Sequence, residues 1–170
     1  MKFIELAEKR YSCKKYSAKE VEQEKLDLIL EAGRKAMTAK NEQPQHIYVV
    51  KSEEGLKAID EVTPCRYGAP IVLVMTYDKD KVYWYPGNKY HSGPEDIAIV
   101  ATHMCLQAAE IDIDTCWLNF LDPDKLHELL DLPENEVVVL CLDVGYGSED
   151  FKPLENHYKR KALSETVSYK

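Results

Sequence analysis

Three polar residues near the start of the chain have the types and spacing of a phosphate-binding set. Arg10, Ser12 and Lys14 alternate along a segment, ending at Tyr16, that lacks helical periodicity and is predicted to be extended. Side chains at i, i+2 and i+4 of an extended segment point to one side, so the three polar groups are expected on one face. Together they suit a phosphate monoester, although an exposed basic turn is the alternative.

Three later segments could complete a site for a larger ligand. The loop at 37–45 carries side-chain amides that suit a ribityl chain or the edge of a heterocycle. Trp117, at the end of a short apolar segment, could form a wall against a planar cofactor. Residues 158–161 form a second basic cluster. Each segment has an ordinary alternative: a polar loop, a core tryptophan and a solvated tail.

The charge distribution favours local anion sites over nucleic-acid binding. The net charge is -8, whereas residues 1–20 and 151–170 each carry an excess of three basic side chains. Solvated surface is the alternative for both basic ends. The longest apolar stretch, 69–75, is far short of the ~20 residues that a membrane span needs, and the amphipathic start does not resemble a signal peptide. The sequence therefore predicts a cytoplasmic protein that does not contact membranes.

The cysteines are odd in number, widely spaced and without a CxxC pair. We therefore expect neither a disulfide framework nor a metal site, and we predict reduced, packed thiols. A thiol redox protein that uses Cys116 is a further hypothesis, and the missing CxxC pair counts against it. The five residues are Cys13, Cys65, Cys105, Cys116 and Cys141.

The elements that must position these groups follow from apolar periodicity and from turn residues. Strands are predicted at 46–51, 70–77, 115–118 and 136–144, and helices at 2–9, 17–36, 52–62, 95–111 and 123–130. A capping box of Ser17 and Glu20 is expected to open the second helix. The chain length of 170 residues suits one domain, and the element order indicates an α/β or α+β class. The aromatic segment 82–93 has no assignment, and the polar tail is expected to be tied down or disordered.

The helix predicted at 95–111 has little polar face, so the centre of the fold or a partner chain must bury it. His103 lies within it among apolar neighbours, and we interpret this histidine as a core residue.

Taken in order, these segments resemble the nitroreductase family, specifically its short single-domain members. Residues 9–14 (KRYSCK) are similar to the family's R-x-S-x-R/K opening, and residues 37–44 (MTAKNEQP) to its P-S-x-x-N-x-Q-P-W segment. The segment 103–110 is similar to its long central helix, and Thr115-Cys116-Trp117 to the segment that follows. Departures include Gln45 where tryptophan is usual, and 111–114 (IDID) in place of a Gly-Leu-Gly turn.

The resemblance implies an α+β fold with a central, mostly antiparallel sheet flanked by helices, in one domain over residues 1–170. It implies an intertwined homodimer with FMN at each of two subunit interfaces, and a C-terminal arm from about residue 148 that contacts the partner. Carried over by position, the residues that hold the phosphate and the flavin edge are Arg10, Tyr11, Ser12 and Lys14. The other subunit contributes Thr38, Ala39, Asn41 and Gln43. The isoalloxazine is lined by Cys116, Trp117 and Leu118, and the phosphate is closed off by Lys159 with Arg160.

The implied function is transfer of two electrons from NADH or NADPH, through FMN, to a small planar acceptor that resembles a nitroaromatic or a quinone. Donor and acceptor would share one pocket, so ping-pong kinetics are expected. Flavin N5 carries the hydride, no side chain is assigned as catalytic, and no metal is expected. The aromatic residues 83–85 would roof the pocket. The alternative is a flavin-binding module for storage or sensing, without turnover of its own.

Overall fold

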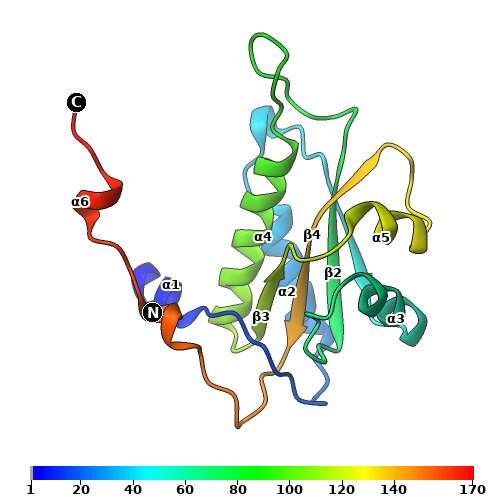
Figure 1. The fold of residues 1–170 in the computed structure, drawn as a ribbon, viewed down its shortest axis with the longest axis vertical. Coiled ribbons are helices and arrows are strands. Elements are labelled where there is room, and N and C mark those ends of the chain that lie inside the picture. Colours follow the sequence, from blue (N-terminus) through cyan, green and yellow to red (C-terminus); the bar gives the residue numbers. More distant parts are fainter. Residues whose placement is uncertain (1) are drawn as a thin grey trace.

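The structure is a computed structural model that describes residues 2–170. Its centre is a sheet of four strands in the order β1-β2-β4-β3, and all neighbouring strands are antiparallel (Figure 1). The strands are β1 (Gln45–Val50), β2 (Ile71–Asp78), β3 (Asp114–Leu118) and β4 (Glu136–Gly145). The predicted α+β class and the predicted strands are confirmed.

Helices cover both faces of this sheet. Leu73 and Met75 of β2 pack in one core cluster with residues of α2 and α4, whereas Val72 and Val74 pack in another with residues of α3 and α5. Because successive side chains of a strand point to opposite faces, a strand covered on both faces is apolar throughout. The helices are α1 (Phe3–Lys9), α2 (Gln23–Arg34), α3 (Glu53–Val62), α4 (Gly93–Glu110), α5 (Pro123–Leu129) and α6 (Leu163–Thr166).

Two helix starts follow the local capping rules, and one prediction is wrong. The side chains of Ser52 and Asp122 each accept a backbone hydrogen bond at 3.1 Å, from Gly55 and Lys125. The capping box predicted at Ser17 does not form, because α2 begins only at Gln23. The Ser17 N–H instead donates to the Tyr146 carbonyl at 2.8 Å, which keeps this part of the chain extended.

The long helix α4 packs closely against α2. Gly33 of α2 allows close packing, since a Cβ atom there would lie 2.8 Å from the Met104 sulfur of α4. Ile99 and Leu106 of α4 are only half-buried, so a single chain covers only part of the apolar surface of this helix. His103 is half-buried and its Nδ1 lies 2.8 Å from the Ile99 carbonyl oxygen, in line with a structural role.

The segment without a predicted element is a β-hairpin that precedes α4. Trp84 pairs with His91, and the Tyr85 N–H donates to the Tyr90 carbonyl at 3.0 Å. Its turn contains Gly87 at φ 92°, a conformation that glycine adopts without strain. The hairpin projects at the top of Figure 1.

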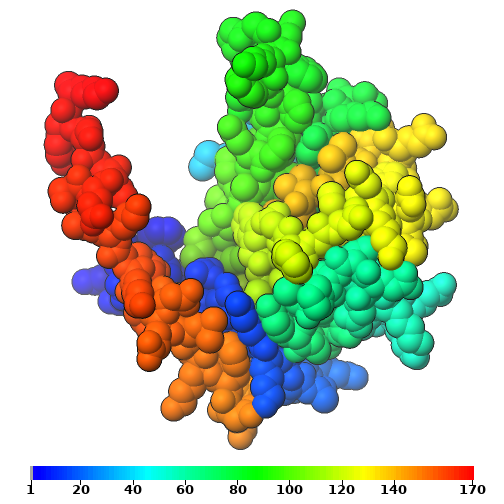
Figure 2. All heavy atoms as spheres, viewed as in Figure 1, coloured from blue at the N-terminus to red at the C-terminus, as the bar shows by residue number. Residues whose placement is uncertain are grey.

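The chain ends in an arm that leaves the body of the protein. It first passes α1, where His157 Nε2 lies 3.1 Å from the Glu8 carbonyl oxygen. All residues of 159–170 are exposed, including Leu163 at 80% and Tyr169 at 97%. Figures 1 and 2 show this arm (red) standing apart from the rest of the molecule. The short helices Glu155–Tyr158 and α6 are its regular parts, and the sequence had predicted neither of them.

Among residues 2–170, the structure contains no helix of the length and apolarity that a membrane crossing requires.

Candidate functional site

The N-terminal segment joins the sheet beside β3 and so brings two predicted segments together. Ser12 forms a parallel bridge with Thr115, and the Cys13 N–H donates to the Thr115 carbonyl at 2.9 Å. Lys14 therefore lies close enough to Cys116 for its charge to act on that thiol. We call residues 10–14 together with β3 the seam.

Within the described part of the chain, two cations of the seam have no carboxylate partner. Lys9 and Lys15 pair with Asp112 and Asp150, but none of the ion pairs found within residues 2–170 includes Arg10 or Lys14. Arg10 and Lys14 flank Ser12 on one extended segment beside β3, so their two charges can act on the same ligand. They form a candidate anion site.

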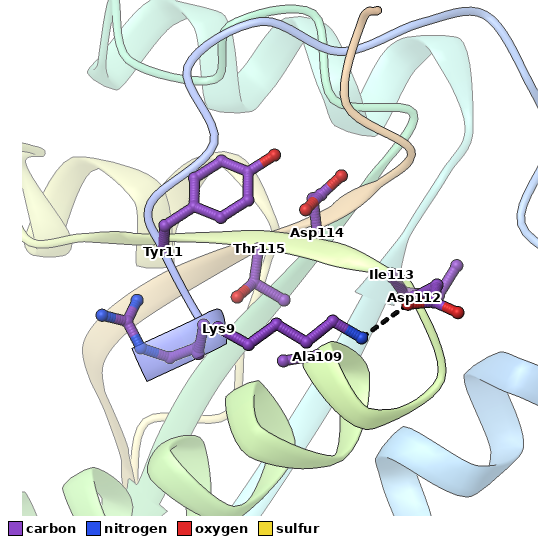
Figure 3. Close-up of a pocket in the computed structure, with 8 residues that line it drawn as sticks. Lys9, Tyr11, Ala109, Asp112, Ile113, Asp114 and Thr115 are labelled. Carbon is purple, nitrogen blue, oxygen red and sulfur yellow. Dashed lines mark hydrogen bonds and ion pairs between the residues drawn. The ribbon is translucent and has the colours of Figure 1, made fainter. Parts of the chain in front are cut away.

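A cavity of about 190 Å³ adjoins the seam. Its walls include the carboxylates of Asp112 and Asp114, and Figure 3 shows the Tyr11 hydroxyl directed toward Asp114. Burial and Asp114 both raise the pKa of Tyr11. Lys9 and Arg10 also line the cavity, so basic and acidic groups face each other there. Sites for drug-sized ligands measure roughly 300–1,000 Å³, so this cavity is too small to enclose a whole flavin.

The side chains of β3 differ in what they offer a ligand. Cys116 and Leu118 are 3% and 4% exposed and belong to the core on the α3 and α5 side. They can line a ligand only through their backbone. Trp117 is half-buried on the opposite face, and its indole N–H donates to the side-chain oxygen of Asn119. Trp117 is thus the β3 side chain available for ring contact.

The second predicted group gathers in the loop before β1. The Ala39 N–H donates to Asp96 Oδ1 at 2.8 Å, and the Gln43 N–H donates to the Thr38 hydroxyl oxygen at 3.0 Å. Lys40, Asn41 and Gln43 have φ values of 51°, 58° and 51°, in the left-handed region that non-glycine residues rarely adopt. Such strain persists where surrounding contacts impose it, and it is often found at ligand sites.

Asp96 anchors this loop, a role that sequence reasoning missed. It is 2% exposed, and its Oδ2 atom is buried without a hydrogen-bond partner in the described chain. Acids are common at helix starts because they complement the helix dipole, so the residue type alone does not single out Asp96. The available signal was spacing, since Asp96 and Val100 lie four residues apart on the same buried stripe of α4.

The loop and the seam lie at opposite ends of α4. The loop is bonded to Asp96, whereas Ala109 lines the cavity beside Arg10. At the rise of an α-helix, Asp96 and Ala109 are about 20 Å apart along the axis. One chain therefore does not bring both groups onto one ring system.

The fourth predicted group lies on the arm. Lys159 and Arg160 are exposed, and the Arg160 guanidinium donates to the carbonyl of Lys159 at 2.8 Å. These contacts hold Arg160 against its own segment of chain. Its binding role stays a prediction.

The thiols do not favour redox chemistry of their own. All five cysteines are free, and four of them are buried, as predicted. Burial and the neighbouring Asp143 raise the pKa of Cys116 to about 12. Because the thiolate is the reactive form, Cys116 is unreactive near neutral pH.

Comparison with known proteins gives one consistent answer. The model of the nitroreductase family matches residues 7–67 and 63–146. A curated relative from Archaeoglobus fulgidus, named "Putative NADH dehydrogenase/NAD(P)H nitroreductase", is 30% identical over 148 residues, which is 83% of each chain.

Solved structures show the same similarity over nearly the whole chain. A nitroreductase family protein from Clostridium difficile 630 is 39% identical, with a TM-score of 0.93 and coverage of 99% of this chain and 98% of the other. A protein from Clostridium difficile R20291, titled an FMN-dependent nitroreductase, is 27% identical, with a TM-score of 0.75 and coverage of 94% and 98%.

Proposed function

Because the chain belongs to the nitroreductase family, we propose that it is an FMN-dependent oxidoreductase that passes two electrons from NADH or NADPH to a small planar acceptor. Two similar proteins carry names that state FMN dependence or NAD(P)H nitroreductase activity. Within this chain, the proposal is supported by the unpaired cations of the seam and by the polar, strained loop at 38–43.

The donor set fits FMN. Arg10 supplies a guanidinium fork for a phosphate monoester, Ser12 a hydroxyl, and Lys14 a point charge. The exposed amides of Asn41 and Gln43 suit the ribityl chain or the ring edge, and half-buried Trp117 suits the ring. When bound, FMN accepts two electrons from the nicotinamide and passes them on to the acceptor.

In this proposal the protein supplies position and charge. Lys14 places an ammonium group where it stabilises the negative charge that accompanies reduction. Tyr11 stays protonated at neutral pH, because burial and Asp114 raise its pKa, so it adds no negative charge to the seam. Donor and acceptor occupy one pocket in turn, and the reaction is ping-pong.

The observation that carries the proposal is the separation of the seam from the loop by the length of α4. We propose a homodimer in which the loop at 38–43 of each chain reaches the seam of its partner. Half-buried Ile99 and Leu106, and exposed Phe3 and Ile4 at 65% and 67%, offer apolar surface for such an interface. The arm, from about residue 148 and exposed throughout 159–170, would lie along the partner and bring Lys159 and Arg160 to the phosphate of the FMN there.

The test is a visible spectrum followed by anaerobic reduction. The purified protein should be yellow, should release FMN on denaturation, and should lose its flavin absorbance when mixed with NADH or NADPH. A flavin that stays oxidised with both donors would instead support a storage or sensing module. A colourless monomer that does not respond to added FMN would refute the proposal.

A further inference from the structure

The hairpin at 83–92 has two chemically different faces. Because Trp84 lies opposite His91 and Tyr85 opposite Tyr90, alternation puts Trp84 and His91 on one face. The other face carries Tyr83, Tyr85 and Tyr90, and the rings of Tyr83 and Tyr85 are 5.8 Å apart between centroids. We call it the tyrosine face.

Two ammonium groups lie over the tyrosine face. Lys40 Nζ is 4.5 Å from the ring centroid of Tyr83, and Lys89 Nζ is 5.1 Å from that of Tyr90. Neither lysine takes part in the ion pairs found within residues 2–170. The carboxylate on this side is that of Glu95, which accepts a hydrogen bond from the Tyr85 hydroxyl. Positive charge therefore exceeds negative charge at this face.

The face is open to a ligand. A hollow of about 450 Å³ is lined by Tyr85, Lys89, Tyr90, His91, Pro94 and Glu95, and Tyr90 is 60% exposed. Aromatic rings stack on such a surface, and an ammonium group beside a ring attracts an anionic substituent.

Lys40 connects the tyrosine face to the proposed flavin site. It belongs to the strained loop at 38–43, and Asp96 holds that loop to α4 through Ala39. If the loop of one chain reaches the FMN of its partner, the tyrosine face of that chain lies beside the partner's flavin ring. The inference thus rests on the proposed function and names the class of ligand that the site selects.

We propose that the tyrosine face, with Lys40 and Lys89, binds planar ligands that carry an anionic group while they react at the partner subunit's flavin. The tyrosine rings contact the plane of the ligand, and the positive charge of Lys40 and Lys89 attracts its anion. The anion has two possible sources: the carboxylate of an aromatic acceptor, or the phosphates of the nicotinamide donor. Reduction of the flavin by the donor and its reoxidation by the acceptor can be measured separately, which distinguishes these two sources.

The acceptor arm compares two probes that differ in charge. FMN-loaded, full-length protein is reduced anaerobically with dithionite and mixed with 4-nitrobenzoate or with neutral 4-nitrobenzamide. The wild type should react faster with the carboxylate, and its preference should fall roughly fivefold in the double variant Lys40→Gln/Lys89→Gln. Raised ionic strength should weaken the wild-type preference, since exposed charges are screened. The matched control is Lys57→Gln on α3, which should retain the wild-type ratio.

The donor arm repeats the comparison with hydride donors. Oxidised protein is mixed with NADH or with neutral 1-benzyl-1,4-dihydronicotinamide, and the ratio of reduction rates is compared between wild type and double variant. A fall confined to the acceptor arm assigns the lysines to the acceptor, and a fall confined to the donor arm assigns them to the dinucleotide. Unchanged ratios in both arms overturn the inference.

The design keeps the two proposals distinguishable. Dithionite reduces the flavin without a nicotinamide, so the acceptor arm remains informative even if NADH and NADPH prove not to be donors. Flavin content and thermal midpoint are measured for every variant, so that loss of FMN or of folding is not mistaken for lost selectivity. A wild type that binds no FMN overturns both proposals.

Discussion

Asp143 on β4 lies directly opposite Cys116 on β3, and its carboxyl group is fully buried. Neither carboxyl oxygen has a hydrogen-bond partner within residues 2–170, and the nearby Tyr16 hydroxyl is likewise unpartnered. Burial raises the pKa of Asp143 to about 9, although Arg66 acts in the opposite direction. The strand beside the seam therefore contains a carboxyl group that is neutral at pH 7.

This burial predicts a pH-dependent stability. An unfolded aspartate ionises near its ordinary pKa of about 3.9, so the folded state is favoured fully below that pH and loses stability as pH rises toward the folded pKa. We expect Asp143→Asn to remove most of the loss between pH 5 and pH 8, which amounts to at most about 4 kcal/mol. Urea denaturation at a fixed FMN concentration measures the free energy of unfolding at each pH. The variant Asp80→Asn, at an exposed position, is the control. An unchanged pH profile in Asp143→Asn would contradict the assignment.

Glu136 has the opposite pH behaviour. Its carboxylate accepts hydrogen bonds from Thr76 at 2.6 Å and Tyr48 at 2.8 Å, and it lies 2.7 Å from His46 Nδ1. Burial alone would raise the pKa of Glu136, but these contacts outweigh it and lower the pKa. This stabilisation is present above the unfolded pKa and is lost as pH falls through the folded one.

We therefore expect Glu136→Gln to destabilise the fold by about 1–3 kcal/mol at pH 7. The difference from the wild type should shrink when denaturation is repeated below pH 4. Glu149→Gln, at an exposed position, serves as the control. Equal stability of Glu136→Gln and the wild type at pH 7 would show that the network contributes little.

Arg10→Ala tests the phosphate assignment. Removal of one bidentate charged contact should raise the dissociation constant for FMN about tenfold or more. Lys9→Ala is a matched control, because Lys9 adjoins Arg10 but already pairs with Asp112. Equilibrium dialysis with FMN measures both variants. Retention of FMN by Arg10→Ala at the wild-type level would remove Arg10 from the site.

Deletion of residues 159–170 tests the arm. These residues are exposed throughout, so the truncated chain should keep its circular dichroism spectrum. We expect a smaller dimer fraction in light scattering and weaker FMN retention, because Lys159 and Arg160 are lost. A truncated protein that stays fully dimeric and keeps its flavin would show that the arm is dispensable.

Cys116→Ser separates flavin chemistry from thiol chemistry. The thiol is 3% exposed and its pKa is raised to about 12, so it supplies almost no thiolate at neutral pH. We expect anaerobic reduction of bound FMN by NADH to continue in this variant. Electron transfer that disappears while flavin content is unchanged would revive the thiol hypothesis.

Local sequence determined most of the elements. The apolar run of β2, the apolar helix α4 and the caps at Ser52 and Asp122 were all predictable, because their signals lie within a few residues of the structure that they specify. The candidate cations Arg10 and Lys14 were also visible, since an alternating basic segment in an acidic chain is a local pattern.

Tertiary structure alone decided how these parts meet. Ser12 pairs with Thr115, some hundred residues away, and the same kind of distant contact, from Ser17 to Tyr146, prevents the predicted capping box. Asp96 and Asp143 gain their roles by burial, which depends on what packs over them. Residue spacing encodes the period of an element and the face on which a side chain lies. The partner that covers that face is selected by packing of the whole chain, so the contacts around the candidate site required the fold.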